Sequence, residues 1–149
     1  MIIGIDPGQR GAYAAITSSS VDAWTMPSLH ELADRLSALK PRHVFLEKGQ
    51  SMPKQGIASA FNYGHHCGEL SGVLVALGIP HTLVRPATWA REMHQGTRLA
   101  PAKSRSLEAA QRLWPWLSFV PAGCKKPHDG IIDALLLAEF GRRSLGRST

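Results

Sequence analysis

Four acidic side chains stand at positions where a folded chain can bring them together. Asp6 closes the apolar run "IIGID", and Glu47 closes the run "HVFLE". Asp129 and Asp133 are four residues apart in "HDGIIDALLLAEFG", so on a helix they would project from neighbouring turns, about 40° apart. An acid beside a buried strand costs free energy, and two carboxylates at this spacing repel each other. These positions therefore need a compensating positive charge.

A divalent cation would compensate the charge of these acids. Carboxylate oxygens are preferred ligands of Mg²⁺ and Mn²⁺, and a pair of such ions can activate water and stabilise the leaving oxygen at a phosphodiester. Simpler interpretations stay open at this point: Asp129 only caps a helix, and single acids at strand ends have no chemical role. Capping does not explain Asp133, which lies a full turn further along.

The hydrophobic pattern predicts the elements that position these acids. Residues 2–6 and 11–17 form a hairpin around "PGQRG", and a third strand covers 21–25. Further strands are expected at "HVFLE" and "HTLVRP". Helices are expected at "SLHELADRLSAL" with Ser28 as N-cap, at 57–77, and at "ATWAREM", "KSRSLEAAQRLW" and "HDGIIDALLLAEFGRR". A hairpin followed by crossovers predicts an α/β domain around a mixed sheet.

The helix expected at 57–77 has two different faces. The face expected to meet the sheet carries Tyr63, Cys67, Leu70, Val73, Leu74 and Leu77. Small residues recur every four positions on the other side, at Ala60, Gly64, Gly68, Gly72 and Ala76. This smooth stripe fits tight packing within the domain, simple tolerance of small residues, or a subunit interface, and we slightly favour the interface.

Composition narrows the class of protein and partner. The 149 residues are 44% hydrophobic and 19% charged, as expected for one globular domain. No apolar run approaches the roughly 20 residues that span a bilayer, and no signal-peptide pattern opens the chain. Two cysteines are too few for a disulfide framework, so we expect an intracellular protein. A net charge of +6 favours a polyanionic partner, foremost nucleic acid.

Five segments in order along nearly the whole chain resemble the RuvC family of Holliday-junction resolvases, most closely its phage-type members. They are "IGIDPGQRGAYA", "VFLEK", "MPKQGIASAFNYG", "VRPATWAR" and "HDGIIDALLLAEFG". The resemblance implies an RNase H-like fold with a mixed five-stranded sheet flanked by helices. It also implies a homodimer, expected to form through the helix that carries Gly64, Gly68 and Gly72. The activity implied is metal-dependent cleavage of two symmetric strands of a four-way DNA junction, in DNA recombination and repair.

The resemblance also assigns roles to the acids. Asp6 is the central metal ligand, Glu47 the second acid, and Asp129 and Asp133 the C-terminal pair. Bacterial members often separate the last two catalytic residues by three positions, where this chain has Gly130. We therefore rank Asp133 first, Asp129 second and His128 third for this pair. His128 is either a proton shuttle or a helix-entry residue without chemistry.

Two Mg²⁺ ions per site are expected, and Mn²⁺ can substitute. One ion, held by Asp6 with Asp133 and Asp129, would position the attacking water, and the other, shared with Glu47, would stabilise the departing 3′ oxygen. The products would carry 5′-phosphate and 3′-hydroxyl ends. We expect the nuclease domain at 1–141, a basic flexible tail at 142–149, and a location in the cytoplasm of a bacterial cell or a phage-infected host.

Candidate DNA contacts surround the acids in the sequence. They are Arg10, Lys48, Lys54, Gln55, Phe61, Lys103 and Arg105. For the charged residues the alternative is a solvated surface, and for Phe61 a core position is the preferred interpretation. Trp114 and Trp116 are expected in the core or at its rim. Two other functions stay open: a broader nuclease for forks and flaps, and a non-catalytic architectural protein that binds branched DNA.

Overall fold

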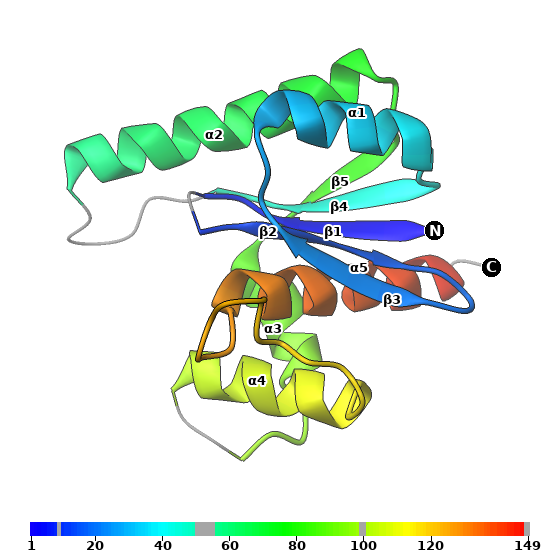
Figure 1. Ribbon diagram of the computed structural model, residues 1–149, viewed down its shortest axis with the longest axis vertical. Helices are drawn as coiled ribbons and strands as arrows, with labels where there is room; N and C mark the ends of the chain where they lie inside the picture. The colour runs from blue at the N-terminus through cyan, green and yellow to red at the C-terminus, as the bar shows by residue number, and fades with distance from the viewer. Residues whose placement is uncertain (9, 50–55, 99–100, 148–149) are drawn as a thin grey trace.

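A five-stranded mixed sheet forms the centre of the molecule in a computed structural model that describes residues 1–8, 10–49, 56–98 and 101–147 (Figure 1). The strands are β1 (Ile2–Asp6), β2 (Ala12–Ile16), β3 (Val21–Thr25), β4 (His43–Glu47) and β5 (His81–Val84), in the order β3-β2-β1-β4-β5. β1, β2 and β3 are antiparallel, whereas β4 and β5 run parallel to β1. The mixed sheet predicted from the sequence is confirmed.

Helices cover both faces of this sheet. α1 (Leu29–Leu39) and α2 (Ile57–Ala76) lie on one face, and α5 (Asp129–Gly146) lies on the other, with α3 (Pro86–Met93) and α4 (Ala102–Leu113) outside it (Figure 1). α1 begins where the sequence predicted, because the Ser28 side chain accepts a hydrogen bond from the Glu31 amide at 3.2 Å. The three-layer arrangement leaves the two faces of the sheet with separate hydrophobic cores.

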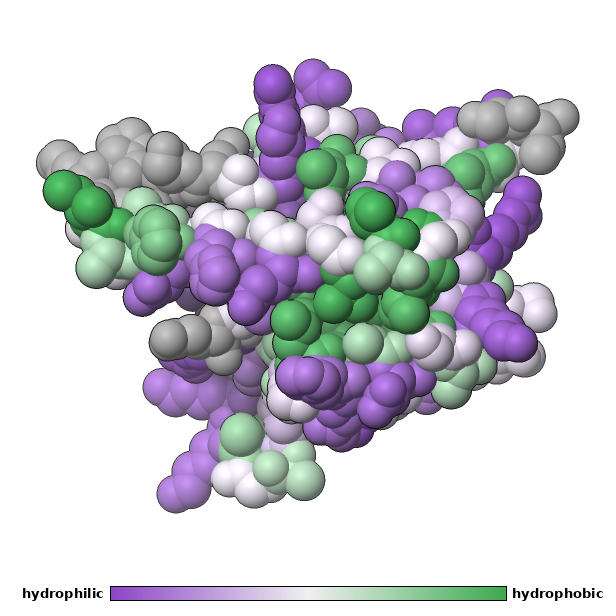
Figure 2. All heavy atoms as spheres, turned by 90° about the horizontal axis from the view of Figure 1, so that it is seen from above, coloured by the Kyte–Doolittle hydropathy of each residue, from purple (hydrophilic) through white to green (hydrophobic). Residues whose placement is uncertain are grey.

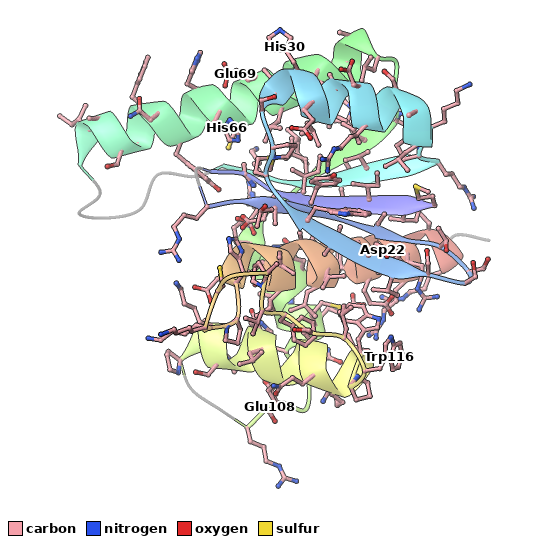
Figure 3. All side chains as sticks on the ribbon, in the orientation of Figure 1. Asp22, His30, His66, Glu69, Glu108 and Trp116 are labelled. Carbon is pink, nitrogen blue, oxygen red and sulfur yellow. The ribbon has the colours of Figure 1, made fainter. Side chains whose placement is uncertain are left out.

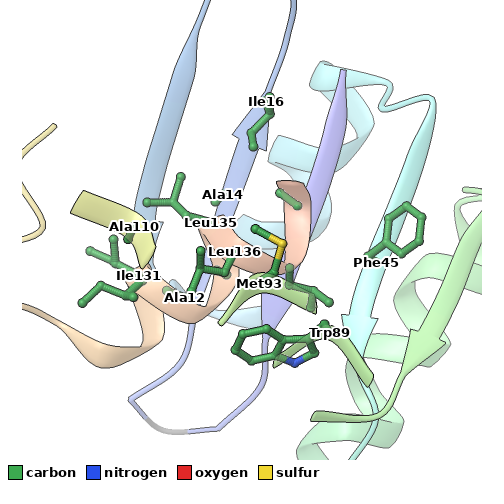
Figure 4. Packing of buried hydrophobic residues seen from close by; sticks show 14 of the residues in the cluster. Ala12, Ala14, Ile16, Phe45, Trp89, Met93, Ala110, Ile131, Leu135 and Leu136 are labelled. Carbon is green, nitrogen blue, oxygen red and sulfur yellow. The ribbon is translucent and has the colours of Figure 1, made fainter. Parts of the chain in front are cut away.

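The core between the sheet and α5 depends on close contact of helix and strand. A Cβ at Gly4 in β1 would lie 2.2 Å from the Ala134 carbonyl oxygen, and one at Gly141 in α5 would lie 2.2 Å from the ring of Phe45. Trp89 and Met93 from α3 pack into the same cluster (Figure 4). Glycine is therefore needed at both contact points, and α5 is held directly against β1.

α2 corrects two expectations, one at its C-terminal end and one along its first half, which extends past the sheet edge (Figure 1). Leu70 and Leu74 pack into the core as predicted, but Leu77 is 38% exposed, because the helix ends there and the chain continues toward β5. A Cβ at Gly64, Gly68 or Gly72 would meet nothing within 4 Å. Tight packing of these glycines within the domain is thus wrong, since no other part of the described chain covers them.

α5 continues to Gly146 and includes residues that the sequence assigned to the tail. Its last turns are braced by Glu139, whose carboxylate pairs with Arg142 at 2.7 Å and Arg143 at 2.8 Å. The flexibility of the tail stays a prediction. None of the helices in the described ranges is long and apolar enough to cross a membrane.

Candidate active site

Asp6 is the last residue of β1, at the point where the chain reverses. Gly8 has a φ of +119°, a conformation that favours glycine, and the Gly11 amide donates to the Gly8 carbonyl at 3.0 Å. A Cβ at Gly11 would lie 2.2 Å from the carbonyl oxygen of Asp6, so this position also needs glycine. The turn thereby ends the strand directly at the acid and leaves no side chain crowding its backbone.

Glu47 reaches the same edge because β4 runs parallel to β1. Ile5 pairs with Leu46 in this register, so the two acids follow at neighbouring strand ends. The Glu47 Oε2 atom accepts a hydrogen bond from the indole Nε1 of Trp89 at 2.8 Å. Tyr63 in α2 also lies close enough to lower the pKa of this carboxyl. Trp89 therefore holds Glu47 in place, with Tyr63 beside it.

The start of α5 brings the C-terminal pair to this edge. His128 is the N-cap, and its Nδ1 accepts a hydrogen bond from the Ile131 amide at 3.2 Å. The interpretation that Asp129 caps the helix is wrong, because Asp129 is the first helical residue. Asp133 follows one turn later, and Ser106 in α4 lies close enough to lower the pKa of its carboxyl.

Gly130 makes the approach of α5 possible. A Cβ at this position would lie 2.5 Å from the Arg10 carbonyl oxygen and 3.0 Å from the Asp6 Oδ2 atom. Any larger residue would push the helix away from Asp6. Gly130 thus serves as the contact between α5 and the β1–β2 turn.

The acids share one electrostatic neighbourhood. Burial, followed by the charges of Glu47, Asp133 and Asp129, raises the pKa of Asp6 to about 8. Burial also raises the pKa of Asp133 to about 7, with Glu47 and Asp129 adding to the effect and Ser106 and Lys103 opposing it. Burial raises the pKa of Glu47, and hydrogen bonding to the carboxylate lowers it in part. Such mutual repulsion at a strand edge is typical of a site that binds a cation.

The donor set fits Mg²⁺ or Mn²⁺ in its chemistry. Its oxygens are hard, come from rigid elements and carry more negative charge than their surroundings compensate. In the described part of the chain, no three His, Cys, Asp or Glu side chains converge on a common point as a ready-made metal site. Mg²⁺ keeps several waters and binds proteins through one or two carboxylates, so a shared neighbourhood suffices for the fit.

Basic side chains line the same edge. Lys103, at the start of α4, pairs with Asp129 at 2.6 Å, although both side chains are largely exposed. Arg10 lies within electrostatic range of Lys103, and Arg10, Lys48 and Arg105 are exposed. The predicted contacts Lys54 and Gln55 lie outside the described residues. Four of the predicted cations are thus exposed to solvent, where a phosphate backbone can reach them.

The three aromatic candidates differ in how far they are exposed to solvent. Phe61 is 71% exposed, so the preferred core position for this residue is wrong, because the first half of α2 lies beyond the sheet. Trp114 is buried in the core as expected. Trp116 is 73% exposed and projects beyond the C-terminal end of α4, away from Lys103 (Figure 3). Of these three side chains, Phe61 is the one that lies on the helix beside the acidic edge.

Sequence reasoning missed the residues that hold the acids. The sequence suggests no function for Trp89 beyond its place in "VRPATWAR" and none for Ser106. It predicts only a core position for Tyr63. Their types carry no chemical signal of their own, and their partners lie far away in sequence. Gly130 was noticed only as a departure from a spacing pattern. The glycine that directly follows Asp129 at the start of the expected helix was the sequence feature that could have indicated close packing here.

Comparisons with known proteins identify the fold. No family model and no curated protein sequence matches the chain. Solved structures do: RuvC of Thermus thermophilus has a TM-score of 0.59 at 14% identity, over 96% of this chain and 95% of that one. A fowlpox virus resolvase in complex with Holliday junction DNA has a TM-score of 0.59 at 18% identity, over 97% and 99%. The yeast mitochondrial Holliday junction resolvase Ydc2 has a TM-score of 0.57 at 15% identity, over 98% and 79%. The chain therefore has the RNase H-like fold of the RuvC-type Holliday junction resolvases.

Proposed function

We propose that this protein is a metal-dependent endonuclease that resolves four-way DNA junctions by hydrolysing two symmetric strands. The observation that carries the proposal is the placement of Asp6, Glu47, Asp129 and Asp133 at one edge of the sheet, where burial and then the charges of the other three raise the pKa of Asp6 to about 8. Three structures that share the fold belong to Holliday junction resolvases, and one was solved with the junction DNA bound. The basic residues beside the acids support DNA as the substrate.

Within this proposal the acids would hold two Mg²⁺ ions, or Mn²⁺ in their place. Ions of this kind would supply an activated water and neutralise charge on the departing 3′ oxygen, which would leave 5′-phosphate and 3′-hydroxyl ends. Asp6 would be the central ligand, Glu47 the second acid, and Asp133, aided by Asp129, the C-terminal pair. Arg10 and Lys103 contact the phosphates that flank the cut and hold the strand at the acids.

His128 keeps its proposed role as a proton shuttle in a restricted form. Its Nδ1 accepts the Ile131 amide, so the neutral ring carries its proton on Nε2. That Nε2 atom is the one left to exchange protons with solvent or substrate. Asp129 takes precedence over His128 as partner of Asp133, because its charge contributes to the raised pKa of both Asp6 and Asp133.

We further propose a homodimer formed through α2, since one acidic edge can cut only one of two symmetric strands at a time. Gly64, Gly68 and Gly72 leave an uncovered stripe on this helix. Ile57 and Phe61 are exposed near its start, and hydrophobic side chains are visible on the face that α1 and α2 cover (Figure 2). A smooth stripe with flanking apolar side chains suits contact with a second copy. We further propose that the protein acts in the cytoplasm of a bacterial cell or a phage-infected host.

The test is cleavage of a synthetic four-way junction by the purified protein with Mg²⁺, compared with EDTA. We expect paired, symmetric cuts with Mg²⁺ and none with EDTA, and loss of cutting when each of the four acids is substituted singly. Faster cutting of forks or flaps would favour the broader branched-DNA nuclease. Binding of the junction without any cutting would favour the architectural protein.

A further inference from the structure

Three side chains from α3 and α4 connect Glu47 to Asp133. The Trp89 Nε1 atom donates to the Glu47 Oε2 atom at 2.8 Å. The Trp89 ring packs edge to face with the ring of His94, with centroids 6.0 Å apart and planes at 79°. His94 continues the connection, because its Nε2 atom lies 3.0 Å from the Ser106 Oγ atom. Ser106 in turn lies beside Asp133, and its hydroxyl lowers the pKa of that carboxyl as a hydrogen-bond donor does.

The direction of these hydrogen bonds follows from the chemistry of the groups. A serine hydroxyl has one proton, and toward an ionised carboxylate it must donate. Its oxygen is then the acceptor toward His94, so the neutral His94 ring carries its proton on Nε2. Each donor in the connection therefore has one defined acceptor.

Burial makes the connection rigid. Trp89 is 4% exposed and packs in the core cluster with Met93 and residues of α5 (Figure 4). Ser106 in α4 is 6% exposed. By contrast, the ion pair of Lys103 with Asp129 is largely exposed and contributes little to rigidity. Glu47 and Asp133 are thus the two of the four acids with a buried polar side chain beside them.

We propose that Trp89, His94 and Ser106, here called the Trp89–Ser106 bridge, are positioning residues that hold Glu47 and Asp133 at the separation that the two cation sites need. The inference rests on the proposed function of these acids. Residues behind metal ligands orient them and restrict their motion, and their loss typically reduces metal affinity or activity about 10–100-fold. The bridge joins one ligand from each side of Asp6, so α3 and α4 support the whole site.

The bridge is tested in the full-length protein with Trp89→Phe and Ser106→Ala, which remove one donor each and keep most of the packing. Trp114→Phe and Ser104→Ala are the matched controls, since Trp114 is buried in the same core and Ser104 lies in the same helix. Mn²⁺ binding is measured by calorimetry without DNA, and junction cleavage in single turnover. We expect Mn²⁺ affinity and cleavage rate to fall about 10–100-fold in the bridge variants and to stay within about threefold in the controls, with junction affinity unchanged.

His94 offers a rescue experiment. A glutamine side chain keeps an N–H donor for Ser106, whereas phenylalanine keeps the ring and loses the donor. We expect His94→Gln to retain Mn²⁺ affinity within about threefold and His94→Phe to match Ser106→Ala. Equal effects of the two His94 variants would contradict the hydrogen-bonded connection, since a purely packing role favours phenylalanine.

An NMR measurement tests the bridge even if the Trp89 and Ser106 variants fail to fold. The Trp89 indole N–H resonance, one of four in the sequence, should shift in the folded Glu47→Gln protein more than the other three. An unshifted set of indole signals overturns the bridge, as does wild-type Mn²⁺ affinity in Trp89→Phe and Ser106→Ala. If the wild-type protein binds Mn²⁺ but cuts no junction, the proposed function fails and the Mn²⁺ affinities of the variants still decide the bridge. A wild-type protein that binds no Mn²⁺ overturns both.

Discussion

At the scale of single residues, Asp6 decides how the charge of the site affects the fold. It is held at a strand end where burial and three other acids oppose its ionisation, which raises its pKa from 3.8 to about 8. The folded protein therefore binds this proton more tightly than the unfolded chain does. The stabilisation of the fold that comes from binding this proton is fully present below about pH 4. It is lost as the pH rises through about 8.

Asp6→Asn should separate stability from activity. The amide removes the charge that the metal-free fold opposes, so we expect the free energy of unfolding in EDTA to rise by about 1 kcal/mol or more at about pH 8.5, and to change less at about pH 5. Urea denaturation at both pH values measures this. The same variant should lose junction cleavage by at least about 100-fold while still binding the junction. Lower stability than wild type at the higher pH would contradict the electrostatic account.

Lys103 tests the contact with DNA at the same scale. Its ion pair with Asp129 is largely exposed, so Lys103→Ala should change the free energy of unfolding by less than about 1 kcal/mol. If Lys103 contacts a phosphate, junction affinity should fall and the slope of log affinity against log salt should decrease by about 1. Fluorescence anisotropy at several salt concentrations measures both. Arg42→Ala, which removes a charge at the opposite end of β4, is the control and should leave the slope unchanged.

At the scale of elements, α5 is the part that assembles the site. It crosses β1 and β2, and its first turn brings Asp129 and Asp133 to the strand ends. Gly4, Gly130 and Gly141 allow the helix and sheet backbones to approach closely along its length. A shift of this one helix would move two of the four acids at once.

Gly130→Ala should displace α5 at its start. The new Cβ would lie 2.5 Å from the Arg10 carbonyl oxygen, a backbone atom that cannot move away alone. We expect a loss of about 1–3 kcal/mol in the free energy of unfolding and a lower cleavage rate. Gly146→Ala is the matched control in the same helix, since a Cβ there meets nothing within 4 Å. Its stability should be unchanged or raised by up to about 1 kcal/mol. Equal stability of the two variants would show that the close contact is unimportant.

At the scale of the whole molecule, α2 is the element whose exposed side needs an explanation. The glycine stripe is open in the single chain, while Leu70 and Leu74 on the other side anchor the helix to the sheet. A change on the open side should therefore affect assembly and leave the fold of one chain intact.

Gly68→Arg should make the proposed dimer dissociate. A long charged side chain would occupy the stripe, and in a helix arginine is more favourable than glycine by up to about 1 kcal/mol. We expect sedimentation velocity to show a dimer for the wild type and a folded monomer for the variant, with paired cutting of the junction replaced by single nicks or lost. Lys40→Arg in the cap of α1, which keeps its charge, is the control. A monomeric wild type at micromolar concentration would contradict the interface.

The sequence alone determined the order of the elements and the mixed sheet and nominated the four acids, because these depend on local patterns. Apolar runs, "PGQRG" and the spacing of Asp129 and Asp133 are all read over a few residues. Tertiary structure decided which side chains face those acids. The hydrogen bond of Trp89 with Glu47 and the approach of Ser106 to Asp133 join residues from separate elements. It also decided that Phe61 is exposed and that Gly130 touches the turn at Asp6, because both depend on where a whole helix lies against the sheet and no local pattern encodes that placement.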